Sequence, residues 1–599
     1  MRVWPRQKGK VEFVYPGADL HAKPKKRVKL VGETQSTVNV SRARLMITAG
    51  LFTFAFISIS IRLVDLMILN GALETGPIYA STQNKPALQF RADIVDRNGR
   101  TIATTLPTVN LYADAAEVIY PEEAATELLS IFPELDPKDL KRRLGSQQRF
   151  IYLRRHLTPT EQVTVNALGI PGLYFEESQR RIYPYGSLFA HVLGSTDTEN
   201  TGSAGVELTF NKALSTRHQD LTLSLDTGVQ SAVHEALSAS RQRFQAIAAA
   251  AVVMDVHTAE LLALVSLPDY DPKESGYVNK DAQFNRATLG LYEMGSTFKL
   301  FTAAMALDQG LIALDSAYDA RTPLTVARYT IDDYHAEKRW LTIPEILIHS
   351  SNIGAAKIAL DAGTPAQQAF LQKIGMLSPL DLELPEVGTP IYPNVWREIN
   401  TVTISYGHGI AVTPVHVASA VGAMVNGGRL VRPTLLRRDT VHPDDSSRVI
   451  SETTSEQMRW LMRLIVKEGS GKRADIPGYV IGGKTGSAEI AKAGGYSQDQ
   501  LRTSFVAAFP LHQPRYVVLV LLDEPQGLKE TYNFTTAGWN AAPTVGRIIA
   551  EIAPILGVYP TTDQPLEPVL GELMEASARI SDMALAPAGN GFWGDRAAE

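Results

Sequence analysis

The stretch Gly295-Ser296-Thr297-Phe298-Lys299 is the most informative one in this chain of 599 residues. It places a lysine three positions after a serine, and no other serine in the sequence has a lysine at that spacing. The residues that follow, up to Gly310, have the apolar pattern of a helix that ends at the glycine. Because positions three apart share one face of a helix, the Lys299 amine is expected to lie against the Ser296 hydroxyl. A neutral lysine there can serve as the base for a serine nucleophile.

A second motif, Ser350-Ser351-Asn352, occurs once and follows the apolar run Ile343–Ile348. The run predicts a helix that ends just before the motif, so we expect the motif to lie in a loop at a cleft. A hydroxyl at Ser350 can relay a proton between a lysine and a leaving group. The amide of Asn352 can donate to a substrate carbonyl and accept from a lysine.

The third motif, Lys484-Thr485-Gly486, also occurs once and lies in a run typical of a β-strand. Lys484 is the candidate for a second cation that lowers the pKa of Lys299. Gly482 and Gly483 precede the motif, and glycine weakens a strand unless something must approach it closely. We expect the approaching group to be a peptide substrate that lies along the strand edge. Lys484, Thr485 and Ser487 would then hold the terminal carboxylate of this peptide.

Each motif alone fits an ordinary exposed helix or a strand that leads into a turn. All three in this order, on a helix, a loop and a strand, predict the active site of a serine acyl-transferase. The backbone N–H groups at the start of the nucleophile helix favour a developing oxyanion. The predicted catalytic residues are Ser296, Lys299, Ser350, Asn352 and Lys484, and the predicted substrate-binding residues are Thr485, Gly486 and Ser487. No metal or cofactor is predicted.

The composition excludes several other classes of protein. The chain has no cysteine, which removes disulfides, thiol catalysis and thiolate metal sites. A net charge of -5 gives no reason to expect a nucleic-acid partner. Since single cores stop growing at about 250–300 residues, the chain must form more than one domain.

The N-terminal region predicts a membrane anchor. No charge interrupts Leu45–Ile61, and the apolar pattern continues to Leu69. A cleaved signal peptide fits poorly, because its apolar region would be shorter and closer to the start. Positive-inside bias keeps the N-terminus in the cytoplasm and places the rest outside, since the preceding segment is rich in basic residues: Arg2, Arg6, Lys8, Lys10, Lys23, Lys25, Lys26, Arg27, Lys29, Arg42 and Arg44. The cluster from Lys23 to Lys29 is expected to set topology or to contact anionic lipid rather than nucleic acid.

The remaining pattern divides the chain into domains. We predict a basic tail over 1–44, an anchor over 45–69, a β-rich non-catalytic pedestal over 70–230, a catalytic domain over 231–559 and a disordered tail over 560–599, with a short helix near Leu566–Ala584. A hairpin is predicted at Asn98-Gly99. The catalytic domain is expected to be α+β, with an antiparallel sheet covered by helices on both faces. Its predicted strands are Ala249–Val256, Leu261–Leu267, Tyr479–Glu489, Thr503–Phe509 and Tyr516–Leu522, followed by a helix over Ala541–Leu556.

The chain resembles the class B penicillin-binding proteins, membrane-anchored D,D-transpeptidases with a β-lactamase-like catalytic fold. The resemblance covers about Leu45 to Val558 and rests on the three motifs together with Arg91–Gly99, Arg181–Gly194, Gly205-Val206-Glu207, Asn285-Arg286-Ala287, Tyr406-Gly407-His408-Gly409 and Thr413-Pro414. The short pedestal and the Ser-Ala-Glu after the third motif are similar to the division (septal) type. The sequence departs from the family pattern at Met294, where proline is frequent, and at Ser487, where threonine is frequent.

The resemblance implies that Ser296 attacks the carbonyl between two terminal D-alanines of a peptidoglycan stem peptide while Lys299 takes its proton. It implies an oxyanion hole made by the N–H groups of Ser296 and Ser487, and inhibition by β-lactams. It also implies a single-pass protein of the inner membrane with a periplasmic catalytic domain. The implied partners are a polytopic glycosyltransferase that polymerises glycan and other division proteins.

Four alternatives stay open. An elongation-type class B transpeptidase would have the same motifs. A β-lactamase would be a shorter chain, usually without an anchor. A D,D-carboxypeptidase differs only in using water to resolve the acyl-enzyme. The fourth is a non-catalytic scaffold of the division complex, against which the intact motifs argue.

Overall fold

The computed structural model describes residues 33–64, 90–216, 219–274, 276, 278–441, 446–492 and 495–561. The chain forms two compact units, one up to Ala87 and one from Leu88 onward. In the first unit, helix α1 spans Glu33–Val64. Within the described part of the chain it is the one helix long and apolar enough to cross a membrane, with a mean hydropathy of 1.8 over Arg44–Ile61.

Helix α1 begins well before the predicted apolar run at Leu45, because no glycine or proline interrupts the polar residues from Glu33 to Arg44. Its large apolar side chains between Leu45 and Ile61 are exposed, as lipid-facing residues would be. Residues 65–69 of the predicted anchor and the predicted short helix at 566–584 lie outside the described residues.

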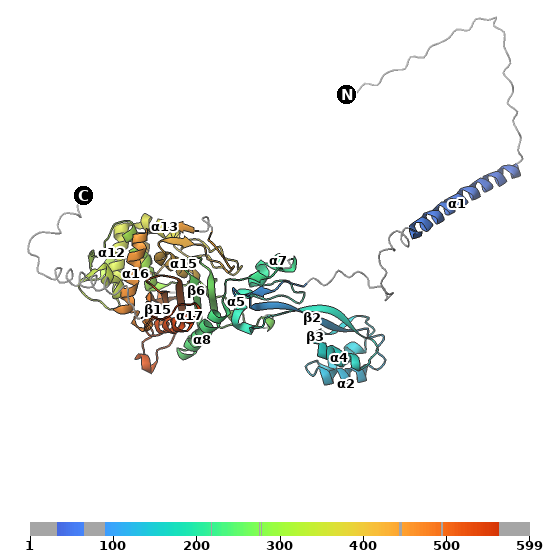
Figure 1. Cartoon of the computed structure of the whole chain (residues 1–599), viewed down its shortest axis with the longest axis horizontal. Helices are drawn as coiled ribbons and strands as arrows, with labels where there is room; N and C mark the ends of the chain where they lie inside the picture. The colour runs from blue at the N-terminus through green and yellow to red at the C-terminus, as the bar shows by residue number, and fades with distance from the viewer. Residues whose placement is uncertain are drawn as a thin grey trace, which may run out of the picture. The chain divides into compact units, whose positions relative to one another are not determined.

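The second unit opens with the pedestal, here defined as residues 90–226. Its sheet has the order β3-β2-β1-β5, and β4 pairs with the long strand β2. Figure 1 shows β2 running from the region of α5 to a head formed with α2, α4 and β3. Buried residues of β2, β3, α2, α3 and α4 form a separate hydrophobic core in that head. The pedestal elements are β1 (Ile94–Val95), β2 (Thr101–Ala113), α2 (Pro121–Ile131), α3 (Pro137–Leu144), β3 (Ile151–Leu157), α4 (Pro159–Ala167), β4 (Leu173–Ile182), η2 (Gly186–Phe189), α5 (Ala190–Leu193), α6 (Gly205–Thr209), α7 (Asn211–Thr216) and β5 (Leu221–Thr222).

The hairpin predicted at Asn98-Gly99 is confirmed between β1 and β2. Gly99 has a φ of +80°, and the Asp96 carboxylate accepts hydrogen bonds from the N–H groups of Asn98 and Arg100. These two bonds to Asp96 Oδ1 close the turn locally, while Asp96 Oδ2 accepts from the N–H and the hydroxyl of Thr227 and so ties the turn to the start of α8.

A buried ion cluster joins three pedestal segments that are far apart in the sequence. Glu207, which is fully buried, accepts from Arg91 Nε at 2.6 Å and from Arg181 Nε at 2.7 Å. Two cations on one carboxylate need further hydrogen bonds in the interior, and Arg91 Nη1 donates to Asn211 Oδ1 while Arg181 Nη1 donates to Thr105 Oγ1. The cluster therefore fixes the start of the pedestal, the end of β4 and helix α6 against one another.

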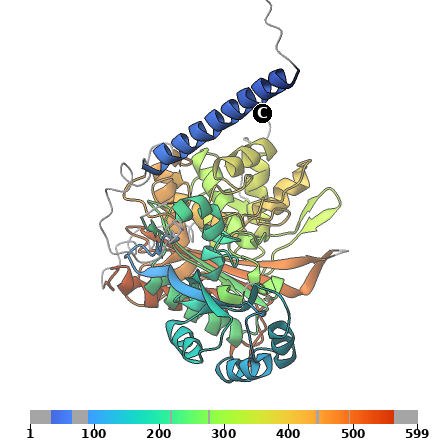
Figure 2. The same ribbon diagram turned by 90° about the vertical axis from the view of Figure 1, so that its right-hand side faces the viewer.

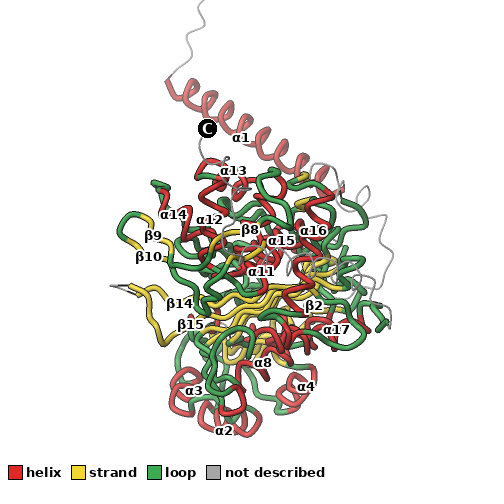
Figure 3. The backbone as a smooth tube through the Cα atoms, turned by 90° about the vertical axis from the view of Figure 1, so that its left-hand side faces the viewer, coloured by secondary structure: helices red, strands yellow, loops and turns green. Residues whose placement is uncertain are grey.

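The larger sheet, here called the central sheet, has the order β14-β15-β16-β6-β7 and every neighbouring pair is antiparallel. Figure 3 shows helices α8 and α17 on one side of its strands and α11, α15 and α16 on the other. Figure 2 shows the pedestal helices, coloured blue-green, apart from this sheet. Its strands are β6 (Ala248–Asp255), β7 (Leu261–Leu267), β14 (Gly482–Lys492), β15 (Gly495–Phe509) and β16 (Tyr516–Asp523).

Alternating residues of the central strands explain the two helical layers. In β6, Ala250, Val252 and Met254 belong to one hydrophobic core, while Ala249, Ala251 and Val253 belong to the other. Because successive side chains of a strand point to opposite faces, a strand that is apolar throughout must be covered on both sides. The predicted α+β arrangement with helices on both faces is confirmed.

The remaining elements connect and cover this sheet. They are α8 (Thr227–Arg243), η3 (Pro272–Glu274), α9 (Lys280–Gln283), η4 (Gly295–Phe298), α10 (Lys299–Asp308), β8 (Ala317–Asp319), β9 (Leu324–Val326), β10 (Tyr329–Ile331), β11 (Trp340–Thr342), α11 (Ile343–Ile348), α12 (Asn352–Ala362), α13 (Thr364–Lys373), α14 (Glu398–Ser405), α15 (Pro414–Val425), β12 (Arg429–Val431), β13 (Ser446–Arg448), α16 (Glu452–Lys467), η6 (Lys472–Ala474), η7 (Lys529–Thr531) and α17 (Ala541–Ile555). The predicted last helix is thus confirmed to within one residue at its end.

Three predicted starts are wrong. Strand β14 begins at Gly482 rather than Tyr479, and β15 begins at Gly495 rather than Thr503 because β14 and β15 continue together as a long hairpin. The helix expected to include Ser296 begins at Lys299, and Ser296 lies in the preceding 3-10 turn η4.

Candidate active site

The nucleophile and its lysine meet as the spacing predicts. Ser296 lies in the turn η4 and Lys299 is the first residue of α10, and Lys299 Nζ lies 3.1 Å from Ser296 Oγ. Lys299 is 1% exposed, so its amine contacts protein groups rather than bulk water. The 3-10 turn still places residues three apart on one side, because its repeat is three residues.

The second motif surrounds the same amine. Lys299 Nζ lies 2.7 Å from Asn352 Oδ1 and 3.1 Å from Ser350 Oγ, and it also donates to the Ser350 carbonyl oxygen. Ser350 has a φ of +57°, in the left-handed region. This backbone conformation turns both the carbonyl oxygen and the hydroxyl of Ser350 toward Lys299.

The third motif completes the chain of contacts from strand β14. Lys484 is fully buried, and its Nζ lies 2.9 Å from Ser350 Oγ and 3.4 Å from Thr485 Oγ1. Ser350 Oγ therefore lies between two lysine amines. Thr485 Oγ1 is 2.6 Å from Ser470 Oγ, and Ser487 Oγ accepts from the N–H of Ala537 at 3.1 Å.

The electrostatics of the two lysines follow from burial. Burial lowers the pKa of Lys299 well below its usual value, the Lys484 charge lowers it further, and the Asp333 carboxylate partly opposes both effects. Burial lowers the pKa of Lys484 to about 7. Removing an ammonium group from water disfavours its charged form, so burial makes the neutral form of Lys299, the candidate base, easier to reach.

Gly486 is required by the close approach of the nucleophile turn. A Cβ at this position would lie 2.3 Å from Met294 O and 2.7 Å from Thr297 Oγ1. Gly295 is similarly close to the strand, because its Cβ would lie 2.8 Å from Ser487 O. Strand β14 and the turn that carries Ser296 are therefore in direct backbone contact.

The explanation predicted for Gly482 and Gly483 is wrong. A Cβ on Gly482 would lie 2.3 Å from Leu511 Cδ2 and 3.1 Å from Arg463 N, and one on Gly483 would lie 2.5 Å from Val506 O. The close approach that excludes a side chain here is made by the loop after β15, helix α16 and strand β15. Strand β14 nevertheless lies at the edge of the central sheet, as the peptide-binding prediction requires.

Asp333 is a site residue that the sequence does not reveal. Its Oδ2 accepts from Ser351 Oγ at 2.7 Å, and its Oδ1 accepts from the N–H groups of Asn352 at 2.5 Å and of Ile353 at 3.0 Å. The carbonyl oxygen of Asp332 accepts from Asn352 Nδ2 at 3.0 Å. The loop after β10 thus fixes the backbone and the amide of the second motif. No local pattern around Asp333 signals a contact with residues so much later in the chain.

An aromatic cluster next to the third motif was also not predicted. Trp539 stacks on Phe534 with ring centroids 5.5 Å apart, and Tyr532 meets Trp539 edge-on at 5.8 Å. The guanidinium of Arg473 lies 3.6 Å over the Trp539 ring. Ala537, in the same loop, contacts Ser487, so the cluster lies beside the end of the motif that is expected to bind substrate.

All eight predicted site residues therefore lie together on η4, α10, α12, strand β14 and the loop before α12. Five of them, Ser296, Lys299, Ser350, Asn352 and Lys484, are joined directly by the contacts of the two amines. Within the described residues, no group of acidic and histidine side chains is arranged to hold a metal ion.

Comparison with known proteins agrees with this geometry. The Penicillin binding protein transpeptidase domain family matches residues 249–549, and the Penicillin-binding Protein dimerisation domain family matches residues 88–226. The chain is 37% identical over 538 residues to the probable peptidoglycan D,D-transpeptidase FtsI of Caulobacter vibrioides, covering 87% of this chain and 90% of that protein. It is 28% identical over 506 residues to the peptidoglycan D,D-transpeptidase FtsI of Escherichia coli K12, covering 78% of this chain and 84% of that protein.

Solved structures share the fold. The penicillin binding protein 3 of Mycobacterium tuberculosis, solved in complex with aztreonam, superposes with a TM-score of 0.63 at 23% identity and covers 80% of this chain and 98% of that one. The family matches extend over both the pedestal and the central sheet, and they include the three motifs joined in the active site. The chain therefore belongs to the class B penicillin-binding proteins, which combine a dimerisation domain with a penicillin-binding transpeptidase domain.

Proposed function

We propose that this chain is a peptidoglycan D,D-transpeptidase of the division type and that it acts through an acyl-enzyme on Ser296. The observation that carries the proposal is the continuous contact chain from Ser296 Oγ through Lys299 Nζ and Ser350 Oγ to Lys484 Nζ. The names of the relatives, which are D,D-transpeptidases, support the reaction and its role in division.

The partners of Lys299 favour its role as the general base. A neutral amine has two N–H groups and one lone pair. Asn352 Oδ1 and the Ser350 carbonyl oxygen can only accept, so they take the two N–H groups. The lone pair is left for one of the two hydroxyls at 3.1 Å, Ser296 Oγ during acylation and Ser350 Oγ during the relay, and Ser296 donates its proton to Lys299 as its Oγ attacks.

Acylation follows from this arrangement. Ser296 Oγ attacks the carbonyl carbon between the two terminal D-alanines of a stem peptide, and its proton passes to Lys299. The negative oxygen of the tetrahedral intermediate is stabilised by the N–H groups of Ser296 and Ser487. The C–N bond then breaks, and Lys299 returns the proton through Ser350 Oγ to the nitrogen of the departing D-alanine.

The same groups carry out the second half-reaction, in which the proton transfers run in the opposite direction. An amine of a neighbouring stem peptide gives a proton to the relay and attacks the acyl-enzyme carbonyl. The ester bond to Ser296 breaks as the new amide forms, and Ser296 Oγ recovers its proton. Lys484, held 2.9 Å from Ser350 Oγ, orients that hydroxyl and adds positive charge where the substrate carboxylate is expected.

The carboxylate of the donor peptide is expected at Lys484, Thr485 and Ser487 on the open edge of β14. Gly486 keeps this edge close to the nucleophile turn. β-Lactams, which imitate the donor peptide, are expected to acylate Ser296 in the same position, and the solved relatives in complex with aztreonam and ampicillin support this expectation.

The anchor and the basic N-terminal segment support a location in the inner membrane, with the catalytic domain in the periplasm. The domain boundaries at 44, 69, 230 and 559 are part of the same proposal. A polytopic glycosyltransferase and other division proteins are the proposed partners, together with stem peptides and membrane lipid.

The test is covalent labelling of the full-length protein with a fluorescent penicillin. Ser296→Ala should abolish labelling while leaving the thermal unfolding midpoint almost unchanged, because one hydroxyl contributes little packing. Ser215→Ala, on the exposed face of α7, is the matched control and should label like the wild type. Labelling that persists in Ser296→Ala would show that the nucleophile lies elsewhere.

A further inference from the structure

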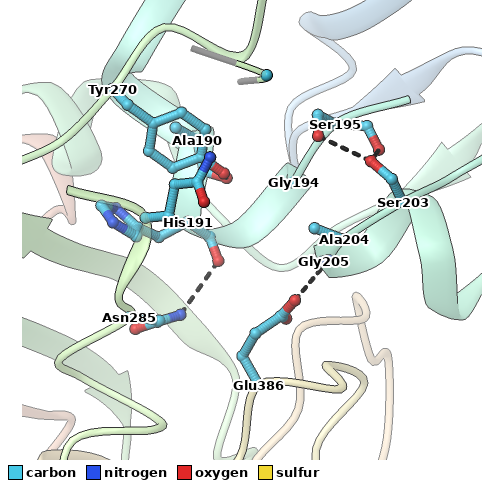
Figure 4. A pocket seen from close by; sticks show the side chains of 12 residues that line it. Ala190, His191, Gly194, Ser195, Ser203, Ala204, Gly205, Tyr270, Asn285 and Glu386 are labelled. Atoms are coloured by element: carbon cyan, nitrogen blue, oxygen red, sulfur yellow. Dashed lines mark hydrogen bonds between the residues drawn. The ribbon is translucent and has the colours of Figure 1, made fainter. Parts of the chain in front are cut away.

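A cavity of about 420 Å³ lies between the pedestal and the region of the central sheet. On the pedestal side its wall is formed by α5 and the chain from Gly194 to Gly205, and on the other side by Tyr270, Gln283, Asn285 and Glu386. Figure 4 shows Glu386 reaching toward Gly205 across this boundary. None of the eight active-site residues lines the cavity.

Among the described residues that line the cavity, Glu386 and His191 are the only acidic or basic side chains. Burial lowers the pKa of His191 to about 4, and its Nε2 lies 2.8 Å from the Ala282 carbonyl oxygen, so the ring is neutral at neutral pH. The wall therefore carries one negative charge. Among the described residues no basic side chain pairs with Glu386.

The hydrogen bonds of the wall leave one group unsatisfied. Glu386 Oε1 accepts from Gly205 N at 3.2 Å, whereas Oε2 is buried and has no partner among the described residues. The other polar groups shown in Figure 4 have protein partners: Ser195 with Ser203, Asn285 with the His191 carbonyl, and Tyr270 with the Ala190 carbonyl. A buried carboxylate oxygen without a donor is costly, and a positively charged donor would relieve that cost.

We propose that this cavity binds a primary ammonium group on a short aliphatic chain, with Glu386 as its counter-charge. One ammonium is sufficient, because Glu386 Oε2 is the one buried acceptor without a partner among the described residues of the wall. The chain that carries it should be apolar, because the remaining polar groups are already paired. The terminal torsion of a glutamate is soft, so a small rotation of the carboxylate presents Oε2 to the ligand while Oε1 keeps Gly205.

The ammonium would also contact Tyr270, which lies on the same side of the boundary as Glu386. Tyr270 Oη, which donates to the Ala190 carbonyl at 3.3 Å, keeps its lone pairs for an incoming N–H. The Glu386 charge is near this hydroxyl, since it adds to the burial that raises the pKa of Tyr270 to about 12. The ammonium would therefore have oxygen partners from both Glu386 and Tyr270, while Gly205 N keeps its bond to Glu386 Oε1 across the boundary.

Two sources could supply this chemistry: a free small amine, or the aliphatic ammonium side chain of a peptide. The proposal depends on neither the activity nor the substrate of Ser296. Its test is calorimetric titration of the full-length protein in detergent with pentylammonium chloride, at constant ionic strength, with 1-pentanol as the neutral ligand of the same length.

We expect the wild type to bind pentylammonium at least about tenfold more tightly than 1-pentanol, as a charge-assisted hydrogen bond requires. Glu386→Gln should remove this preference, because its amide oxygen can still accept from Gly205 N but the charge is lost. Asp381→Asn, which removes an exposed carboxylate paired with Arg432, is the matched control and should retain the preference. Penicillin labelling at the wild-type rate would show that each variant is folded.

Ala204→Leu provides a second variant, because it fills the cavity and leaves Glu386 in place. It should bind neither probe. A capped lysine, acetylated at Nα and amidated, distinguishes the sources: comparable binding assigns the site to a peptide side chain, and binding of pentylammonium alone assigns it to a free amine. Equal binding of pentylammonium and 1-pentanol, no binding of either, or a preference that survives Glu386→Gln would overturn the proposal.

Discussion

Replacing Asp333 by asparagine tests whether the loop after β10 controls the active site. In the wild type the two carboxylate oxygens accept three hydrogen bonds, from Ser351 Oγ, Asn352 N and Ile353 N. Asparagine keeps one acceptor oxygen for the two backbone N–H groups, and its amide nitrogen cannot accept from Ser351. The variant therefore loses one charge-assisted hydrogen bond, typically about 1.5–3 kcal/mol. If that loss falls on the acylation transition state, the rate drops about ten- to a hundredfold.

Asp333→Asn should also lower the pKa of Lys299. The Asp333 charge raises the pKa of Lys299 against the lowering by burial and by Lys484. Without it the pKa of Lys299 falls further, so the neutral amine is present at lower pH. The rising limb of the acylation rate against pH should therefore move to lower pH in Asp333→Asn. A loop that is merely misfolded would lower the rate without moving the limb.

The assay is the second-order rate of acylation by a fluorescent penicillin between pH 5 and pH 9, measured by stopped flow. Asp332→Asn, the same substitution at the exposed neighbouring residue, is the control and should stay within a few-fold of wild type with an unmoved limb. A limb in Asp333→Asn that stays in place or moves to higher pH would refute the assigned electrostatic role of Asp333.

Three further changes test other parts of the structure. Lys299→Arg keeps the charge but cannot release a proton, so its acylation rate should fall about a hundred- to ten-thousandfold, almost as far as in Lys299→Ala; a rate within a few-fold of wild type would move the base to Lys484 or a water. Gly486→Ala brings a Cβ within 2.3 Å of Met294 O, so the Ser296 turn must shift; acylation should slow about a hundredfold and the unfolding midpoint should fall, and a variant that acylates like the wild type would contradict this contact. Glu207→Ala leaves two arginines buried without their carboxylate, which should cost about 3–5 kcal/mol in chemical denaturation, and a loss under 1 kcal/mol would contradict the structural role of this cluster.

The parts of the fold that the sequence predicts are those set by local pattern. Strands β6, β7 and β16 are continuous apolar runs, and their ends agree with prediction to within one residue. The ends of β14 and β15 do not, because Gly482 and Gly483 break the strand pattern and the hairpin extends through polar residues. Pairing with a neighbouring strand, which the sequence does not display locally, determines those ends.

The site residues divide in the same way, into those that a local motif reveals and those that only contacts in the folded chain bring together. The motif residues were predictable because each motif is short and its residue types have a defined chemistry. Asp333 was not, because its partners lie on another element and only the folded chain brings them together. The aromatic cluster at Trp539 was missed for a similar reason, since its rings are spaced without a helical or strand period.

The left-handed backbone of Ser350 implies a trade-off between the stability of this enzyme and its activity. A non-glycine residue at φ +57° typically costs about 1–3 kcal/mol, and this cost recurs in every folded molecule. Glycine would remove it, so Ser350→Gly should raise the unfolding temperature while it eliminates the hydroxyl between Lys299 and Lys484. Selection for thermostability alone would therefore favour glycine at position 350, although that residue inactivates the enzyme. A stabilised variant of this chain should be designed with Ser350 unchanged.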